Sequence, residues 1–484
     1  MKLFLYLLLL LLWLLVTPLV SLQAQPINLP EVIQIAKQQS VAAKQAITQK
    51  QTNFWQYRAF QADFRPQLSL DGSLPNFTRS FIPVTQPDGT INFQQISNNN
   101  SLLNLTLNQN IPFTGGTIFL QKQLQRFDNF QQKNTLYNGI PLAIGINQPL
   151  FRYNPMKWSR KIEPLWYAER NQQFIESLEQ VALSATGLYF DLLVAQVNLQ
   201  MAQKNLQNND TLYKIAGQKL QLGKLSQNDL LQLQLSVVSA RKELASAEQT
   251  AAVASLGLKS YIGYRNERPL ELVIPTNIQA FEVNTQTALD EAFANRSNAI
   301  AFRRKLLEAE RDVNKAKKDN GLNASLNAAF GLSNQGAQLG DVYFRPQDRE
   351  YIEIQFNLPI MTWGRSKART ETALAYQQLA VQSVEQDKLT FEQQVFTQVT
   401  LLQMLQKQVA LTVEADQIAA SRYQIAQDRF KLSNLSVTDL VIATQEKDRA
   451  KRDAILALRD YWQAYYMLRL LTLYDFEHNE KITY

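Results

Sequence analysis

Very few residues in this chain could perform covalent chemistry. The chain has no cysteine and a single histidine, His478, close to the C-terminus. Disulfides, thiolate metal sites and cysteine nucleophiles are therefore excluded. No group of Asp and Glu residues stands at the spacing that metal ligands or a general acid and base would need. The sequence favours a protein that is not an enzyme and that uses no metal and no cofactor.

Two aspartates at matching positions carry a more specific signal. Asp229 and Asp439 each stand three residues after a serine, Ser226 and Ser436. A serine followed three residues later by an acidic residue is typical of a capping box, which opens a helix. A carboxylate in the first turn also complements the helix dipole. The two motifs therefore predict the first turns of two helices.

These motifs belong to a longer repeated segment. Residues 215–231 (IAGQKLQLGKLSQNDLL) recur as residues 425–441 (IAQDRFKLSNLSVTDLV), with seven of the seventeen positions identical. The same offset aligns Asn147 with Asn357. Such self-similarity predicts that the chain is built twice from one unit.

Long helices are expected on either side of each motif. Over residues 174–220, apolar residues recur at alternating steps of four and three, which is the heptad pattern of a coiled coil. A second heptad pattern covers 230–261, and the second unit repeats the plan less strictly. Segments 157–222 and 365–432 could each form a helix roughly 100 Å long at about 1.5 Å per residue.

The remaining helical segments are shorter. The returning segments, 226–261 and 436–474, follow the motifs, and each unit begins with a separate helical stretch, 29–63 or 287–318. Placed end to end, an opening stretch and a returning segment span about the length of one continuous helix. We therefore expect a mainly α fold with a small β part, in which each unit contributes long antiparallel coiled-coil helices.

Alternating apolar and polar residues predict strands between the helices. The second unit has such stretches at 323–330 and 351–358, and the first unit at 67–71 and 140–148. A strand of about nine to eleven tilted residues crosses a bilayer with one face toward lipid. A soluble sheet shows the same alternation. Four such stretches, placed symmetrically between long helices in a chain whose N-terminus resembles a signal peptide, nevertheless favour transmembrane strands.

The first unit holds about fifty residues more than the second in this region. Two further candidate strands, 103–111 and 117–124, lie inside the extra stretch, roughly 75–135. The stretch could be an external loop or two added strands of the wall. Four strands cannot close a barrel, because open strand edges are not tolerated in lipid. The strands are therefore expected to contribute to a barrel shared between copies related by cyclic symmetry.

The N-terminus predicts export. Lys2 is followed by an apolar run, and small residues precede a cleavage site near Ala24–Gln25, which is typical of a secretory signal peptide. The formal net charge of +7 is dispersed along the chain, and no basic cluster indicates nucleic acid. Beyond the signal peptide, no run of apolar residues is long enough for a transmembrane helix.

These observations divide the chain into five parts. They are a signal peptide (1–24), repeat unit 1 (25–265), a linker (266–286), repeat unit 2 (287–476) and a C-terminal tail (477–484). The helical hairpin of each repeat turns at a tip, near residues 222–226 in the first and near residues 432–436 in the second.

Four short motifs, taken together with their order along the chain and their constant spacing, resemble those of the TolC-like outer-membrane efflux protein family. Two stand where strands give way to helices, Gln148–Phe151 (QPLF) and Leu358–Arg365 (LPIMTWGR), and two stand at the tips, Leu222–Leu230 and Leu432–Leu440. The resemblance covers essentially the whole mature chain. It implies a homotrimer with one shared β-barrel in the outer membrane of a Gram-negative bacterium, and a helical tunnel through the periplasm.

The resemblance also implies a function and partners. The protein is expected to be a passive exit duct for small molecules, which a periplasmic adaptor protein and an inner-membrane efflux transporter hand over. An exit duct of a type I protein secretion system and a periplasmic coiled-coil structural protein remain alternatives. The substrate and the identity of the pump do not follow from the residues.

Site residues follow from the same resemblance. In the family, acidic residues at the start of the returning helix surround the periplasmic aperture, which implies this role for Asp439, with Asp229 as its counterpart. The second acidic position is Ile442 here, and a basic position before the turn is Leu435, so a two-tier ring is not expected. Whether Asp439 gates the aperture or only caps its helix is left open. The tip residues implied to contact the adaptor are Gly223, Lys224, Leu225, Ser226, Ser433, Asn434, Leu435 and Ser436.

Overall fold

The computed structural model describes residues 26–264, 269–276, 278, 281–432 and 435–484. The expected signal peptide and the tip residues Ser433 and Asn434 lie outside the described residues. The chain forms two compact units, and each unit takes residues from both repeats. The tip unit comprises residues up to Thr48, Phe174–Arg296 and Glu392–Tyr484, and the sheet unit comprises Gln49–Gln173 and Ser297–Phe391.

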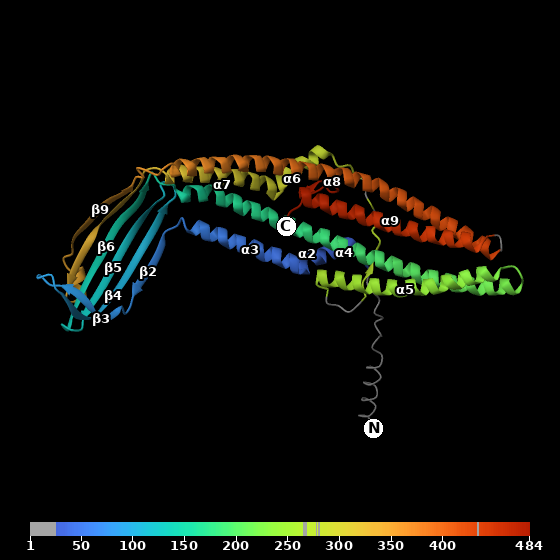
Figure 1. The fold of residues 1–484 in the computed structure, drawn as a ribbon, viewed down its shortest axis with the longest axis horizontal. Helices are drawn as coiled ribbons and strands as arrows, with labels where there is room; N and C mark the ends of the chain where they lie inside the picture. The colour runs from blue at the N-terminus through green and yellow to red at the C-terminus, as the bar shows by residue number, and fades with distance from the viewer. Residues whose placement is uncertain (1–25, 265–268, 277, 279–280, 433–434) are drawn as a thin grey trace, which may run out of the picture. The chain divides into compact units, whose positions relative to one another are not determined.

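The helices occur in the same order in both repeats (Figure 1). The first repeat has α2 (Leu29–Gln39), α3 (Val41–Ala62), α4 (Pro155–Gln221) and α5 (Gln227–Ile262). The second has α6 (Thr285–Asn295), α7 (Ser297–Asp319), α8 (Arg365–Lys431) and α9 (Val437–Thr472). Helices α4 and α8 both have 67 residues, and α5 and α9 both have 36. The expected mainly α, duplicated fold is confirmed.

Each opening helical stretch is divided into two helices, which the sequence pattern did not predict. Helix α2 ends at Ser40, whose backbone is extended and whose Oγ accepts a hydrogen bond from the backbone N–H of Ala43 at 3.1 Å. This serine is buried, so its hydroxyl replaces a helical partner at the break. Arg296 has an extended backbone at the corresponding break between α6 and α7.

Among the described residues, one helix has the length and composition of a membrane span. A window of α4 passes this test, although 56% of the window is buried within the protein. The sequence analysis expected no such window. Burial of this kind is found in the core helices of soluble proteins too, so α4 gives only weak evidence for a transmembrane helix.

The sheet unit contains an antiparallel sheet with the strand order β2-β4-β5-β6-β8-β9. The strands are β2 (Gln67–Ser73), β4 (Ile91–Ile111), β5 (Gly116–Asn129), β6 (Asn134–Leu150), β8 (Asn323–Gly336) and β9 (Gln347–Asn357). A further strand, β3 (Phe77–Thr85), pairs with the first half of β4. The extra stretch of the first repeat therefore adds three strands, of which β4 and β5 lie within the continuous strand order and β3 lies on the same side of β4 as β2. Strands β2 and β9 are the two ends of that order.

Five short elements, four strands and one 3₁₀ helix, complete the secondary structure of the described residues. Strand β1 (Pro26–Ile27) pairs in parallel with β7 (Glu271–Leu272), and β10 (Tyr474–Asp475) pairs with β11 (Glu480–Lys481). A 3₁₀ helix, η1 (Leu339–Tyr343), lies between β8 and β9. The two small sheets belong to the tip unit.

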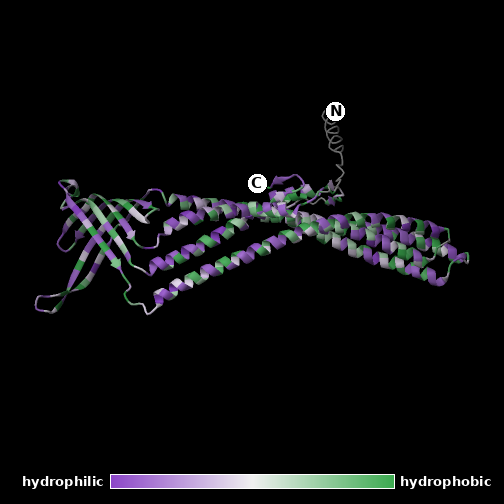
Figure 2. Ribbon diagram, turned by 90° about the horizontal axis from the view of Figure 1, so that it is seen from above, coloured by the Kyte–Doolittle hydropathy of each residue, from purple (hydrophilic) through white to green (hydrophobic). Residues whose placement is uncertain are grey.

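The large sheet has one apolar and one polar face. Cross-strand pairs bring Leu70 beside Leu105 and Ile144 beside Phe330 on one face. On the other face, Gln121 Nε2 donates a hydrogen bond to Asn104 Oδ1 at 2.9 Å. Hydrophobic and hydrophilic residues alternate along the strands in Figure 2. The exposed members of the apolar face include Leu68, Leu70, Leu105, Ile118, Leu120, Ile144, Phe330, Ile352, Ile354 and Phe356.

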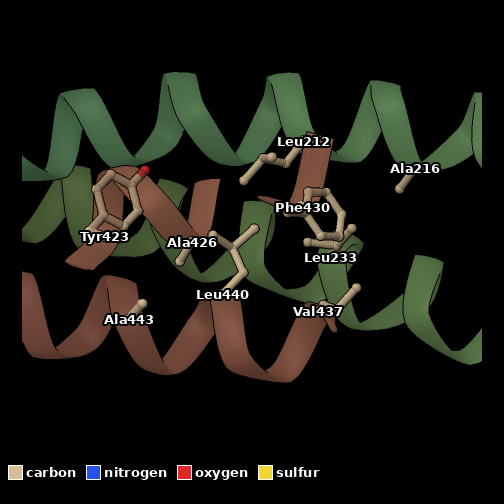
Figure 3. Close-up of a cluster of buried hydrophobic side chains, with 9 residues drawn as sticks. All are labelled: Leu212, Ala216, Leu233, Tyr423, Ala426, Phe430, Val437, Leu440 and Ala443. Carbon is tan, nitrogen blue, oxygen red and sulfur yellow. The ribbon is translucent and has the colours of Figure 1, made fainter. Parts of the chain in front are cut away.

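The tip unit is held together by the heptad side chains of four helices. Figure 3 shows a buried cluster to which α4, α5, α8 and α9 all contribute. Small residues bring the helices close, while Phe430 and Leu440 fill the space between them. The cluster comprises Leu212, Ala216, Leu233, Tyr423, Ala426, Phe430, Val437, Leu440 and Ala443.

A buried ion cluster ties distant parts of the tip unit together. The carboxylate of Glu179 on α4 accepts from Lys37 Nζ at 2.7 Å and from Arg469 Nε at 3.2 Å. Arg469 also pairs with Asp475, and the hydroxyl of Tyr484 donates to Glu179. Burial alone would raise the pKa of Glu179, but Lys37 and Arg469 outweigh it and hold the pKa below its usual value. The hydroxyl of Tyr484 therefore holds the end of the C-terminal tail against α4.

Replacing Glu179 with Gln is expected to lower the free energy of unfolding by about 3 kcal/mol, because the buried Lys37 loses its carboxylate partner and Arg469 keeps only Asp475. Since the pKa of Glu179 is depressed, its contribution is present at neutral pH and is lost as the pH falls through the folded-state pKa. Thermal unfolding in detergent, followed by circular dichroism, measures both effects.

Asp210→Asn is the matched control. Asp210 pairs with Lys214 at 2.6 Å, but both side chains are exposed, so the loss is expected to stay below about 0.5 kcal/mol. Equal losses of stability in the two variants would contradict a structural role for the buried cluster.

Candidate functional site at the hairpin tips

The first tip is a tight turn that closes the end of α4. The backbone N–H of Gly223 donates to Leu220 O at 2.9 Å, and that of Lys224 donates to Lys219 O at 2.9 Å. Gly223 has a φ of 67°, a left-handed conformation that favours glycine. This arrangement satisfies the last carbonyl groups of α4. It leaves Leu222 and Lys224 exposed, while Leu225 packs against the buried cluster.

Both serine–aspartate motifs cap the returning helices. Ser226 Oγ accepts from the backbone N–H of Asp229 at 3.1 Å and donates to Asp229 Oδ2 at 2.7 Å. Ser436 Oγ makes the same two bonds to Asp439, also at 3.1 and 2.7 Å. Both serines are N-caps, as the sequence predicted, and the complete capping box is confirmed for Ser226 and Asp229.

The two tips differ in one bond of the cap and in exposure. Only at the first tip does the backbone N–H of the serine also donate to the aspartate, from Ser226 to Asp229 Oδ2 at 3.4 Å. Asp439 is exposed and Asp229 is half-buried. Leu435 packs at the edge of the buried cluster, and Ile442 is partly exposed one turn beyond Asp439. Each aspartate therefore presents a carboxylate at the start of its helix, and Asp439 has an apolar side chain at the next level. Chemically, such a site can attract cations electrostatically.

Lys219 joins the C-terminal end of α4 to the C-terminal end of α8, a contact that the sequence analysis did not predict. Lys219 Nζ donates to Phe430 O at 2.6 Å and lies 4.5 Å from the centre of the Phe430 ring. Burial and, to a smaller extent, Lys224 lower the pKa of Lys219. The signal was present in the repeat, because Lys219 aligns with Arg429 and the charge is kept.

Higher in the tip unit, polar side chains join the two hairpins. Asn205 Nδ2 on α4 donates to Asp448 Oδ2 on α9 at 2.5 Å, and Lys447 Nζ lies 3.1 Å from Asp448 Oδ1. Asn208 Nδ2 donates to the hydroxyl of Tyr423 on α8 at 3.1 Å. These bonds fix α4 against both helices of the second hairpin, and thereby set the position of one tip relative to the other.

One group of metal-ligating side chains lies within the described residues, at Asp475, Glu477 and His478. Asp475 Oδ1 already accepts from the hydroxyl of Tyr465 at 3.2 Å, and its Oδ2 accepts from Arg469. His478 Nδ1 lies 3.1 Å from the same Oδ2, and this contact raises the pKa of His478. Contacts within the protein therefore account for the group.

Comparisons with known proteins agree with this architecture. The sequence profile of the outer membrane efflux protein family matches residues 115–264 and 288–472. No curated protein sequence matches the chain at a significant level.

Three solved structures illustrate the likeness in fold. One is CusC, whose crystal structures concern the conformational changes that accompany folding and transmembrane channel formation. It is 16% identical to this chain with a TM-score of 0.65, and the match covers 93% of this chain and 92% of that chain. The outer membrane protein VceC of Vibrio cholerae is 16% identical with a TM-score of 0.63, over 94% and 97%. The CmeC outer membrane channel of Campylobacter jejuni is 15% identical with a TM-score of 0.65, over 94% and 87%.

Substitution of Ser436 by Ala is expected to destabilise the first turn of α9 by about 1 kcal/mol, because the backbone N–H of Asp439 loses its acceptor. Hydrogen exchange at Asp439 and its neighbours should become about fivefold faster. Thr438→Ala is the control, since Thr438 is exposed in the same turn. Equal acceleration in both variants would show that the serine is not the cap.

Proposed function

The chain belongs to the outer membrane efflux protein family, and we propose that three copies form a passive exit duct that spans the outer membrane and extends into the periplasm. An inner-membrane efflux transporter, together with a periplasmic adaptor, delivers small molecules to the periplasmic end. The single observation that carries the proposal is the large sheet, which has an exposed apolar face and two unpaired edges.

An exposed apolar sheet face of this extent fits lipid. The ten exposed apolar side chains on this face come from all six strands of the sheet. In water such a patch favours association, whereas in a bilayer it faces the hydrocarbon. The opposite face carries amide and hydroxyl side chains, such as Gln121 and Asn104, that suit a water-filled interior.

The open edges require other copies. Every neighbouring pair along the six strands is antiparallel, so β2 and β9 run in opposite directions. The β9 edge of one copy can therefore pair antiparallel with the β2 edge of the next, which satisfies the backbone groups that lipid cannot. Three copies make a barrel of about 18 strands, a number that leaves an aqueous channel.

The tips supply the periplasmic end of the duct. In a trimer with cyclic symmetry, each Asp439 carboxylate has two equivalents at the same height, and three carboxylates around one axis favour cations. Capping and charge are compatible, because one carboxylate oxygen bonds to Ser436 while the exposed side chain still faces water. The adaptor is proposed to contact the turns, where Lys224 and Leu222 are exposed.

Purified protein in detergent is expected to have the mass of a trimer and to form conducting channels in planar bilayers. Native mass spectrometry and single-channel recording measure these properties. Protein that stays monomeric and soluble without detergent, and that forms no channels, would contradict the proposal.

Asp439→Asn tests the aperture in the same recordings. The asparagine can still accept from Ser436, so the helix cap is kept while the charge is removed. The cation-to-anion permeability ratio should fall on the order of fivefold, equivalent to about 1 kcal/mol of electrostatic free energy. Asp453→Asn, an exposed substitution further along α9, should leave the ratio unchanged. An unchanged ratio for Asp439→Asn would leave the duct in place but reject the charged aperture.

Adaptor contact can be tested by placing a photo-crosslinking amino acid at position 224. Illumination of cells should give an adduct that contains a periplasmic adaptor, identified by mass spectrometry. Position 204, exposed on α4 above the tip, serves as the control and should give no such adduct. Equal adducts at both positions would reject docking at the tip.

A further inference from the structure

Three basic segments of the sheet unit lie where the helices meet the large sheet. They are residues 152–161 at the start of α4, residues 315–319 at the end of α7 and residues 365–369 at the start of α8. Together they hold ten of the chain's 49 Lys and Arg residues but only one of its 42 Asp and Glu residues. This balance gives them a formal charge of +9, which exceeds the +7 of the whole chain. We call the three segments the basic collar.

Side-chain contacts bring the three segments together at one end of the sheet (Figure 1). Trp158 Nε1 on α4 donates to Asn314 Oδ1 on α7 at 3.4 Å. Asn320 Nδ2, just after α7, donates to the backbone oxygen of Ser366 on α8 at 2.9 Å. The segments stand far apart in the sequence, so their charge is dispersed along the chain and is concentrated only by the fold.

The cations of the collar do not stabilise the helices that carry them. Lys157, Arg160 and Lys161 are exposed and share one face of α4, because they stand three and four residues apart. Within the part of the chain that the structure describes, none of the three forms an ion pair, although Lys161 Nζ lies 5.0 Å from the centre of the Trp158 ring. The first turns of α4 and α8 contain no acidic residue, whereas the N-terminus of a helix favours negative charge. The arrangement points to a negatively charged partner outside the chain.

Large apolar side chains are exposed at the same end of the sheet. Phe113 is 85% exposed in the turn between β4 and β5, and Ile360 and Trp363 are 93% and 90% exposed between β9 and α8. Asn154 Nδ2, just before α4, donates to Phe113 O at 3.2 Å, so this turn lies beside the collar. Trp363 has a φ of 50°, a left-handed conformation that is uncommon for a large residue. Such side chains are unfavourable in water, whereas tryptophan is enriched at the interface between a membrane and water.

We propose that the basic collar binds the phosphate groups of anionic phospholipids in the periplasmic leaflet of the outer membrane, and that Ile360 and Trp363 enter that leaflet. The inference rests on the duct proposed above, because it takes the large sheet as the part that spans the membrane. It adds the class of lipid that surrounds the periplasmic end of the sheet and the residues that recognise it.

The dimensions of the collar suit a bilayer surface. A rise of about 1.5 Å per residue places Lys161 roughly 9 Å along α4 from Pro155, where the helix begins. The field of a charged surface extends over about 8 Å at physiological ionic strength. The cations at the start of α4 are therefore within reach of phosphate groups at the end of the sheet. Each one favours an anionic over a neutral surface by about fivefold.

The lipid preference of the full-length protein in detergent tests the proposal. Phosphatidylglycerol is added to one sample and phosphatidylcholine with the same acyl chains to another, and native mass spectrometry counts the lipids that each trimer retains. The trimer should retain at least about tenfold more phosphatidylglycerol than phosphatidylcholine, because only the first lipid carries a net negative charge.

Removal of three cations from α4 should abolish most of this preference. The variant combines Lys157→Gln, Arg160→Gln and Lys161→Gln, and its preference for phosphatidylglycerol should fall at least about tenfold. The three side chains are exposed, so the fold is expected to be kept.

A matched control removes the same charge elsewhere. It combines Lys204→Gln, Arg241→Gln and Lys242→Gln, three exposed positions on α4 and α5 in the tip unit. This variant should retain the lipid preference of the parent protein, because the tip unit is proposed to lie away from the membrane.

Tryptophan fluorescence tests the apolar part of the inference. Phosphatidylglycerol with brominated acyl chains quenches only tryptophans that contact those chains. Quenching in the parent protein should exceed quenching in Trp363→Phe, and the difference reports on Trp363 alone. Equal fractional quenching in the two proteins would overturn the insertion of Trp363.

The outcomes separate this inference from the proposed function. A monomeric parent that forms no channels would overturn the duct and the collar together. A trimeric, conducting parent that retains both lipids equally, or whose two triple variants lose equal preference, would overturn the collar alone. A collar variant that keeps the lipid preference but lowers anion permeability would assign these cations to the conduction path, and would likewise overturn the inference.

Discussion

Backbone groups along the two outer strands of the large sheet set the conditions for the rest of the structure. The N–H and C=O groups on the outer sides of β2 and β9 have no partner within the sheet. Water can satisfy such groups, but a hydrocarbon layer cannot. A sheet with an apolar exposed face therefore needs further copies, and an even number of strands lets every junction be antiparallel. Rotational closure of the sheet then places all helices of the copies at matching heights.

Matching heights explain why the helix lengths are repeated so closely. Helices α4 and α8 both have 67 residues, whereas α2 and α3 have 11 and 22 and α5 has 36. An opening pair and a returning helix thus provide almost the same length as one continuous helix, and the second repeat follows the same rule. Duplication of one unit supplies this equality at once. The strands are not divided equally between the repeats, because the first repeat supplies four of the six strands in the continuous order of the large sheet.

Local sequence patterns predicted the helices and the tips well. They could not predict contacts between residues that are far apart in the sequence. Heptad spacing and the serine–aspartate motifs set the helix ends near Gln221 and Gln227 to within a few residues. Strand β4 was predicted at 103–111 but begins at Ile91, because its first half is rich in Asn and Gln and shows no apolar alternation. The partners of Glu179 stand far away in sequence, so no spacing rule could have revealed the ion cluster.

In the aperture that we propose, Asp439 serves stability and transport together. Ser436 holds the Asp439 carboxylate at the helix start, which lowers its rotational freedom as well as capping α9. A fixed carboxylate contributes its charge at one height along the axis, where a mobile side chain would spread it. Ile442 occupies the next level, so the carboxylate of Asp439 has no acidic side chain directly above it at that position. In the proposed duct, a single layer of carboxylates would attract cations without retaining them, which is what conduction requires.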